Sequence, residues 1–391
     1  EWLRLLENKG VNILSLEKNI GTWSVKQLLD KVRNKLSDSN KQDFSHEVMD
    51  AMSGCLACKA CASQCPIKVD VPDFRARFLN VYHSRYFRPL KDHLVANVEV
   101  LTPLMAKAPR LVNAVLDNKF YDKASKSTIG YIDTPLLSVP TLKKRSDQHG
   151  FEKFDLSNFQ QYSAEQRQQY VFIVQDPFTS FYDADVVENM MKLINKLGFK
   201  PVLLPFKPNG KPQHVKGFLT KFAKTASNTA DFLNQLHQLS IPMIGMDASL
   251  ALCYRDEYQQ ILAEKRGAFK VLLAHEWLIS MIAHNKLAFN QETIKDKSAY
   301  KLFAHCTEKT ALAGSEQEWI NIFAAFGLTL EKVAVGCCGM AGTYGHEQVN
   351  FENSKGLYEL SWQPKLADLD ESKIVVTGYS CRSQVKRLAK I

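Results

Sequence analysis

Four cysteines crowd into one short stretch of the chain, "SGCLACKACASQCP" (residues 53–66). They are Cys55, Cys58, Cys61 and Cys65, separated by two, two and three residues. Thiolate sulfur is the ligand that iron–sulfur clusters and zinc prefer in proteins. This stretch constrains the fold more than any other feature, because the backbone around it has to bring several sulfur atoms to one metal centre.

The spacing of these cysteines favours iron over zinc. The run Cys-x2-Cys-x2-Cys-x3-Cys followed by Pro66 is found in bacterial ferredoxins, where each iron of a cubane takes one soft thiolate. Zinc ribbons instead place a long loop between two cysteine pairs. The residues between the cysteines include small ones that let the backbone wrap a cluster: Ala57, Ala60 and Ala62. The sequence therefore predicts a 4Fe-4S cluster on Cys55, Cys58, Cys61 and Cys65, with zinc or bare thiols as the alternative.

The run occurs only once in the sequence. In two-cluster proteins the fourth cysteine of each run binds the other cluster. Either Cys65 closes the same cluster as the first three cysteines, or it reaches toward a cluster completed by a run upstream of Glu1. The opening residues, "EWLRLLE", look like the middle of a helix and lack the order of a signal peptide. We therefore expect the chain to be part of a longer protein.

Composition narrows the class of protein. Nine cysteines in 391 residues, without a signal peptide, argue for metal or redox chemistry in a cytoplasmic protein. The net charge of +9 is spread along the chain and no nucleic-acid module accompanies it, so no nucleic-acid partner is expected. No apolar run is long enough to span a bilayer. The basic segment 85–110 is a candidate for lipid contact, peripheral at the inner membrane, or for packing against a neighbouring domain.

The sequence pattern changes from helical to alternating along the chain. Before residue 150 it is mostly helical, with helices predicted at 24–36 and from Asp70 onward. The segment 135–169 is polar and irregular, so we place a domain boundary there. From Tyr170 onward, strands alternate with helices. The predicted strands are 171–174, 200–206, 241–246, 302–304, 333–335 and 374–377, and the predicted helical stripes are 185–197 and 319–326.

The second part of the chain repeats itself at a nearly constant offset. The matched positions are Gly198 with Gly327, Gly210 with Gly339, Cys253 with Cys381, and Asp176 with Cys306. This pattern indicates a duplicated α/β unit. The predicted fold class is therefore α+β with several domains. They are an all-α iron–sulfur domain (1–150), a degenerate α/β repeat (151–295) and an α/β repeat that retains its cysteines (296–391).

A second group of cysteines follows the predicted strands of the last repeat: Cys306, Cys337, Cys338 and Cys381. Ligands of α/β sheets bind at the carboxyl ends of the strands. The glycines of "GCCGMAGTYG" suit a loop that approaches a ligand closely, although they do not form a dinucleotide fingerprint. These residues predict a second metal or redox site. The alternative is that they are small buried hydrophobic residues, which is our interpretation of the isolated Cys253.

The spacing of Cys306, Cys337-Cys338-Gly339 and Cys381 resembles the "CCG" cysteine-rich domain. That domain occurs in the B subunit of heterodisulfide reductase, the glycolate oxidase iron–sulfur subunit and the C subunit of anaerobic glycerol-3-phosphate dehydrogenase. The family pattern ends in Cys-x2-Cys, whereas this chain has Gln384 at the last position. The first repeat carries Asp176 and Pro208-Asn209 in place of cysteines. The family's ligand set is therefore incomplete here.

The stretch "SGCLACKACASQCPIKVDVPDFRARFLNVYHSRY" resembles the C-terminal region of long bacterial FAD-linked 2-hydroxy-acid dehydrogenases, most closely those that oxidise D-2-hydroxyglutarate to 2-oxoglutarate. The resemblance implies a helical ferredoxin-like domain followed by a duplicated CCG domain. It implies that FAD lies on an upstream domain or a partner, and that none is bound by this chain. Electrons would pass from the flavin to the 4Fe-4S cluster and on to a quinone or carrier, in a homo-oligomer. The chain alone would not oxidise substrate, and its sequence identifies no catalytic residue.

Two other functions fit the same residues. The chain is similar enough to the glycerol-3-phosphate and glycolate oxidase iron–sulfur subunits to be a complete electron-transfer subunit that works with a partner. A thiol or heterodisulfide reductase acting at Cys337 and Cys338 is a third interpretation. The coding sequence directly upstream of Glu1 separates the first two functions.

Overall fold

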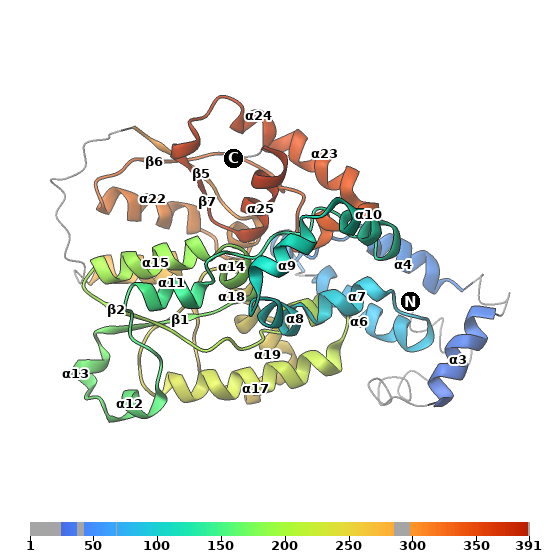
Figure 1. Ribbon diagram of the computed structural model, residues 1–391, viewed down its shortest axis with the longest axis horizontal. Helices are drawn as coiled ribbons and strands as arrows, with labels where there is room; N and C mark the ends of the chain where they lie inside the picture. The colour runs from blue at the N-terminus through green and yellow to red at the C-terminus, as the bar shows by residue number, and fades with distance from the viewer. Residues whose placement is uncertain (1–24, 37–42, 68, 285–297, 390–391) are drawn as a thin grey trace. The chain divides into compact units, whose positions relative to one another are not determined.

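The computed structural model describes residues 25–36, 43–67, 69–284 and 298–389 (Figure 1). The fold is α+β, mostly helical with small parallel sheets. The helix suggested by the opening residues lies outside the described part. Two compact units are present: the first comprises residues up to Val98 together with Gly210–Thr225, and the second comprises Glu99–Asn209 and residues from Ala226 onward. The three-part division at residues 150 and 295 stays a prediction.

The first unit is built from short helices. They are α3 (Val25–Leu36), α4 (Ser45–Ser53), α5 (Ala60–Gln64), α6 (Val71–Arg85), α7 (Leu90–Ala96) and α16 (Lys211–Val215). The helices predicted at 24–36 and after Asp70 are confirmed. α6 begins where predicted because the Asp70 side chain accepts a hydrogen bond from the Asp73 amide (2.9 Å) and Pro72 occupies the first turn.

The carboxylate of Asp43 ties α4 to the end of α6. It accepts hydrogen bonds from the Ser45 amide (3.0 Å) and the Tyr86 hydroxyl (2.7 Å), and it forms an ion pair with Arg85 (2.8 Å). Burial alone would raise the pKa of Asp43, but these hydrogen bonds and the Arg85 charge lower it. α4 leads directly into the cysteine run, so this buried carboxylate fixes the helix that precedes it.

A segment from much later in the chain completes the first unit. Arg75 of α6 donates to the carbonyl of Val215 (2.9 Å), at the end of α16. Lys216 forms an ion pair with Asp92 of α7 (3.0 Å), and both side chains are buried. Gly217 has a φ of +69°, and a Cβ there would lie 2.5 Å from the Cβ of Leu79, so only glycine fits.

The second unit contains two parallel sheets. The strands of the first sheet are β1 (Tyr170–Val174), β2 (Lys200–Leu203), β3 (Met243–Gly245) and β4 (Leu272–Leu273), in the order β2-β1-β3-β4. Those of the second are β5 (Tyr300–Phe303), β6 (Leu330–Lys332) and β7 (Ile374–Val376), in the order β6-β5-β7. Both sheets thus place their first strand between the second and the third.

The strand predicted at 333–335 is wrong in position, because β6 ends at Lys332. Only Leu330 of that strand is buried. The apolar residues Val333 and Val335 instead pack against the hydrophobic cluster around Phe303 and Trp362. The apolar pattern at 333–335 therefore corresponds to residues that follow the strand and pack in the hydrophobic core. The other predicted strands overlap observed ones.

The remaining helices, apart from those of the first unit, belong to the second unit (Figure 1). Those before β3 are α8 (Val98–Met105), α9 (Pro109–Leu116), α10 (Lys119–Thr128), α11 (Leu142–Gln148), α12 (Leu156–Gln161), α13 (Ala164–Arg167), α14 (Pro177–Tyr182), α15 (Ala184–Lys196) and α17 (Leu219–His237), the last of which begins in the first unit. The later ones are α18 (Ala248–Arg255), α19 (Glu257–Leu262), α20 (Ala274–Ala283), α21 (Cys306–Ala311), α22 (Ser315–Ala325), α23 (Phe351–Ser361), α24 (Gln363–Leu366) and α25 (Tyr379–Leu388).

The segment 135–169, predicted to be irregular, contains three of these helices, α11 to α13. Each begins at a polar residue whose side chain accepts a hydrogen bond from the first turn: Thr141, Asp155 and Ser163. Polar residues that cap helices are common in loops as well, so the composition did not reveal these helices.

Among the described residues, no helix combines the length and the apolar character needed to cross a membrane.

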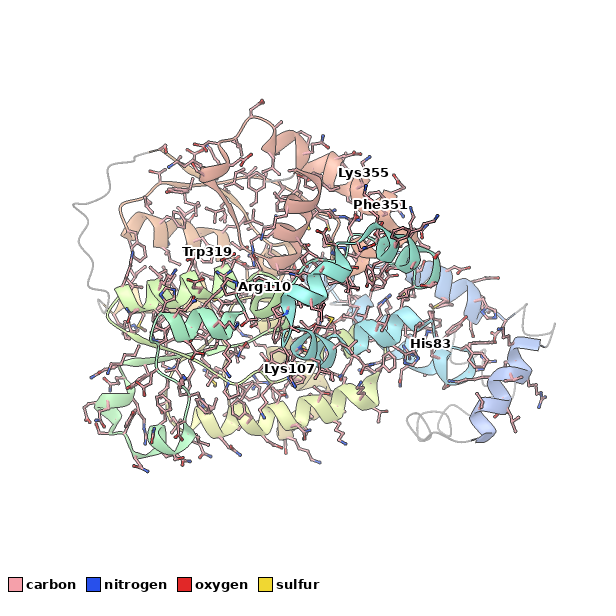
Figure 2. All side chains as sticks on the ribbon, viewed as in Figure 1. His83, Lys107, Arg110, Trp319, Phe351 and Lys355 are labelled. Atoms are coloured by element: carbon pink, nitrogen blue, oxygen red, sulfur yellow. The ribbon has the colours of Figure 1, made fainter. Side chains whose placement is uncertain are left out.

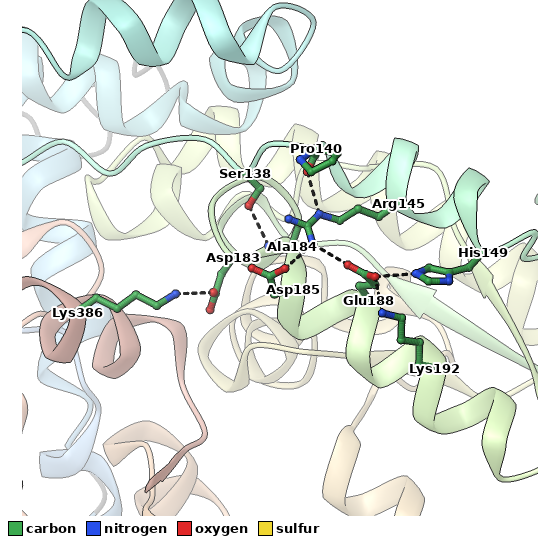
Figure 3. Close-up of polar contacts among 10 residues, drawn as sticks. All are labelled: Ser138, Pro140, Arg145, His149, Asp183, Ala184, Asp185, Glu188, Lys192 and Lys386. Atoms are coloured by element: carbon green, nitrogen blue, oxygen red, sulfur yellow. Dashed lines mark hydrogen bonds and ion pairs between the residues drawn. The ribbon is translucent and has the colours of Figure 1, made fainter. Parts of the chain in front are cut away.

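Charged side chains join α11 to α15 (Figure 3). Glu188 of α15 accepts from Arg145 (2.7 Å) and pairs with His149 (2.7 Å) and Lys192 (2.6 Å). Arg145 also pairs with Asp185. The hydrogen bonds from Lys192, Arg145 and His149 lower the pKa of Glu188 to about 2.

A pH-dependent loss of stability is therefore expected for Glu188→Gln. Because the pKa of Glu188 is depressed in the folded state, its contribution is present above its ordinary pKa and is lost as the pH falls toward 2. We expect the substitution to lower the free energy of unfolding by about 1 kcal/mol at pH 7 and by less at pH 3. Urea unfolding at both pH values measures this. Glu352→Gln, at an exposed position of α23, is the control, and equal losses at both pH values for Glu188→Gln would contradict the assignment.

Candidate metal centre

The cysteine run forms a loop between α4 and α6 in the first unit. α4 ends at Ser53, and the Cys55 amide donates to the carbonyl of Met52 (3.2 Å). Cys61 lies in the first turn of the short helix α5, and the Cys65 amide closes that helix on the Cys61 carbonyl (3.0 Å). All four cysteines thus lie on one loop between α4 and α6.

Two residues of this loop adopt the left-handed conformation. Ala57 lies between Cys55 and Cys58 with a φ of +53°, and Lys59 lies between Cys58 and Cys61 with a φ of +60°. Left-handed residues next to right-handed ones turn successive backbone amides to one side, and such concave sets of N–H groups bind anions and iron–sulfur clusters. The donor set of four thiols and this backbone conformation both fit an iron–sulfur cluster.

The thiols of the run are accessible. Cys61 is exposed and Cys55, Cys58 and Cys65 are half-buried. Cysteines that act only as small hydrophobic residues are usually fully buried, as Cys253 is (0% exposed). The exposure of the run therefore favours a chemical role over a packing role, and the burial of Cys253 agrees with its interpretation as a core residue.

Charged residues anchor the loop at both ends. Lys59, within the run, forms an ion pair with Asp70 (3.3 Å), the residue that caps α6. Arg75 of α6 donates through Nε to the carbonyl of Met52 (3.0 Å), just before the run. Neither anchor was predicted from the sequence. The Asp70-x-Pro72-Asp73 cap signature was the available signal for Asp70, whereas the pairing of Arg75 with a carbonyl depends on the fold.

The side chains of the cysteine run do not form a ready-made metal site. Across the part of the chain that the structure describes, no three His, Cys, Asp or Glu side chains lie in an arrangement that would hold a metal ion. The four cysteines of the run lie close together in the sequence, on one loop. Binding of a cluster would require their side chains to converge.

The second group of cysteines meets at one edge of the second sheet. Cys306 begins α21 directly after β5, Cys337 and Cys338 lie in the loop after β6, and Cys381 lies in the first turn of α25 after β7. Hydrogen bonds link Cys306 to Cys337, Cys337 to Cys338, and Cys338 to Cys381. The structure thus brings together all four cysteines that the sequence assigned to this site.

The pKa values of these thiols are raised above the ordinary value. The hydrogen bond with Cys337 and burial raise the pKa of Cys306. The hydrogen bond with Cys306 lowers the pKa of Cys337, but that with Cys338 and burial raise it to about 11. Cys338 and Cys381 are buried, and their pKa values are also raised. As thiols they are poor nucleophiles, and they would have to lose protons to bind a metal.

Glycines allow the close packing of this edge. Gly339 has a φ of +85°, and a Cβ there would lie 2.1 Å from the carbonyl oxygen of Ser354 on α23. A Cβ on Gly378 would lie 2.3 Å from the ring of His305. His305 is buried, and its Nδ1 has no hydrogen-bond partner among the described residues. The loop at Gly339 therefore lies close to helix α23 of the protein itself.

Polar residues stand at the positions where the CCG pattern has cysteines, and they have structural roles. Gln384 is fully buried and donates to the hydroxyl of Ser354 (3.0 Å). Asp176 caps α14 by accepting from the amides of Phe178 and Thr179 (2.8 Å each). Asn209 donates to the carbonyl of Leu250 (3.2 Å). These positions hold polar residues that satisfy buried backbone groups.

Together, a cysteine run on a helical unit and a second set of thiols at the edge of a parallel sheet define a cysteine-rich α+β protein. Over 99% of its length the chain is similar to D-2-hydroxyglutarate dehydrogenases, with 54% identity to that of Escherichia coli (strain K12). It is 41% identical to the Pseudomonas putida enzyme over the whole chain. The chain spans about 38% of the length of these relatives.

A more distant relative is also a dehydrogenase component. The C subunit of the anaerobic glycerol-3-phosphate dehydrogenase of Escherichia coli (strain K12) is 26% identical over 216 residues, which cover 54% of this chain and 52% of that subunit. The relatives are dehydrogenases, which bears out the prediction of an oxidoreductase. No family model matches the chain. No solved structure matches it.

The glycine requirement in the second thiol group gives a matched test. Gly339→Ala forces a Cβ into the Ser354 carbonyl in a left-handed conformation, so we expect a loss of about 3 kcal/mol or more in the free energy of unfolding. Gly342 has a φ of +65° but open space around its Cβ position, so Gly342→Ala should cost only about 1 kcal/mol. Denaturant unfolding compares the two, and equal losses would show that steric contact with Ser354 is unimportant.

Proposed function

We propose that this chain is the C-terminal iron–sulfur electron-transfer region of an FAD-linked D-2-hydroxy-acid dehydrogenase that converts D-2-hydroxyglutarate to 2-oxoglutarate. The observation that carries this proposal is the cysteine run on a loop with two left-handed residues, in a chain 54% identical to a D-2-hydroxyglutarate dehydrogenase. The ferredoxin spacing suits an electron-transfer cluster rather than a structural zinc.

The residues of the loop have separate roles in this proposal. A 4Fe-4S cluster supplies single-electron exchange when it is bound. Cys55, Cys58, Cys61 and Cys65 would hold it as thiolates. The ion pair between Lys59 and Asp70 keeps the loop against the start of α6. Whether Cys65 serves the same cluster or one completed from upstream is decided by the iron count of the intact protein.

The proposed architecture is a helical ferredoxin-like domain (1–150) followed by a degenerate CCG repeat (151–295) and a repeat that keeps its cysteines (296–391). The shared strand order of the two sheets supports the duplication. The matched glycines also support the duplication. Gly198 and Gly327 each follow a helix and have a positive φ. Gly210 and Gly339 have φ values of +84° and +85°.

The linked thiols Cys306, Cys337, Cys338 and Cys381 form the second proposed metal or redox site. Their shared edge of the sheet and their mutual hydrogen bonds support it. The family's full ligand set is not present, because Gln384 is engaged with Ser354. Iron, zinc and sulfide counts on anaerobically prepared protein test this site. A metal content that Cys338→Ser does not change would contradict metal binding there.

In this proposal the substrate is oxidised outside the chain. FAD would be bound by an upstream domain or a partner subunit, and the acceptor would be a quinone or carrier. The intact protein would be a homo-oligomer, with the basic segment 85–110 available for a neighbouring domain or a membrane surface.

The cluster assignment predicts a specific defect for Cys58→Ser. In the intact protein this substitution should remove the broad visible iron–sulfur absorbance and slow acceptor reduction about tenfold or more, because one thiolate ligand is lost. Reduction of the flavin by substrate should continue. Absorbance, iron analysis and stopped-flow reduction measure these effects. Cys253→Ala, in the core, should keep its iron. Wild-type iron and turnover in Cys58→Ser would refute the assignment.

A second candidate function is a complete iron–sulfur subunit that works with a separate dehydrogenase. The similarity to the C subunit of anaerobic glycerol-3-phosphate dehydrogenase over 216 residues favours it. The coding sequence upstream of Glu1 distinguishes the two functions, because continuous coding into a flavin domain supports the fused dehydrogenase.

The isolated chain gives an independent test of both candidates. Supplied with FAD and D-2-hydroxyglutarate, it should show no oxidation of substrate, since in either case the flavin site lies elsewhere. Formation of 2-oxoglutarate, followed by an enzyme-coupled assay, is the measurement, with the intact dehydrogenase as the positive control. Sustained oxidation by the isolated chain would contradict both proposals.

A further inference from the structure

A cavity of about 670 Å3 lies in the second unit, and no cysteine lines it. Its floor is formed at the carboxyl ends of two parallel neighbours, by Gln175 after β1 and by Leu203–Phe206 at the end of β2. The turn after α8 and one face of α11 form its sides. Crevices at the carboxyl ends of parallel strands are the usual ligand sites of α/β units, and this volume is that of a small-molecule site.

The cavity has cations without counterions. Lys107, in the turn between α8 and α9, and Lys143 of α11 both line it and are exposed (Figure 2 labels Lys107). Neither lysine has a carboxylate within ion-pair distance among the described residues. The two acidic residues of the cavity are engaged, because Asp147 pairs with Lys153 (3.3 Å) and Glu152 accepts from the hydroxyl of Tyr170 (2.8 Å).

The inner wall is apolar and aromatic with one free hydroxyl. Phe181 and Phe206 meet edge to face, with ring centroids 5.2 Å apart, and Phe154 lines the same cavity. Ser180 also lines it, is 2% exposed, and has an Oγ without a hydrogen-bond partner among the described residues. A buried hydroxyl that lacks a partner is costly unless a ligand or water satisfies it.

We propose that this cavity binds a small aromatic anion. The rings of the ligand would lie against Phe181 and Phe206, and its carboxylate, sulfonate or phosphate group would lie between Lys107 and Lys143. Lysines without partners at the rim attract negative charge, and an aromatic wall takes a flat apolar body. The hydroxyl of Ser180 supplies a hydrogen bond at the inner end. This site is independent of the proposed cluster and needs no electron transfer.

Two probes of the same shape test the charge requirement. 8-Anilinonaphthalene-1-sulfonate carries an anion, and N-phenyl-1-naphthylamine has the same ring system without it. Isothermal titration calorimetry on the intact protein should show tighter binding of the sulfonate. Lys143→Gln should weaken the sulfonate about five- to tenfold and leave the neutral probe unchanged. Lys144→Gln is the matched control, because Lys144 is the next residue of α11, is exposed and does not line the cavity.

A cavity-filling variant tests the location. Ala106 lines the cavity from the turn after α8, and Ala106→Trp should abolish binding of both probes by occupying the space for their rings. Circular dichroism checks that the variant is folded. Sulfonate binding of equal affinity in the wild type, Lys143→Gln and Ala106→Trp would overturn the proposal. Equal weakening by Lys143→Gln and Lys144→Gln would also overturn it, since it would show a general effect of surface charge.

Discussion

The parallel pairing of short strands is the constraint on which the second unit depends. Because β5 lies between β6 and β7 and all three run the same way, the residues that follow them emerge at one edge. Three loops far apart in the sequence thereby bring Cys306, Cys338 and Cys381 into one hydrogen-bonded set. The same constraint in the first sheet sets Gln175 beside the end of β2 and forms the floor of the cavity.

The sequence predicted many of the strands and helices. Buried strands have short apolar runs and amphipathic helices have apolar stripes, and both patterns can be recognised from local periodicity. The cysteine positions at strand ends followed from the same pattern. The error at β6 arose because Val333 and Val335 are buried in a core outside the sheet, and burial alone does not distinguish the two environments. The caps of α11 to α13 were missed because Thr, Asp and Ser serve loops and helix starts equally well.

The candidate metal site could be predicted in part from the sequence. The spacing of Cys55, Cys58 and Cys61 predicts them as ligands, since that information is local. The residues that hold the loop were not evident, because the contact of Arg75 with the Met52 carbonyl depends on how α4 and α6 pack. The left-handed conformation at Ala57 was also hidden, since alanine rarely adopts it without tertiary support.

The docking of Gly210–Thr225 onto the helices of the first unit has a consequence for biosynthesis. Arg75 and Asp92 find their partners only after the ribosome has passed residue 216, so the N-terminal helices remain unfinished while much of the first sheet is being synthesised. A chain truncated at residue 150 would lack the contacts of Arg75 and Asp92 with this segment, so its helices would be less stable. Insertion of the proposed cluster would then have to wait for, or proceed without, a segment encoded more than a hundred codons downstream.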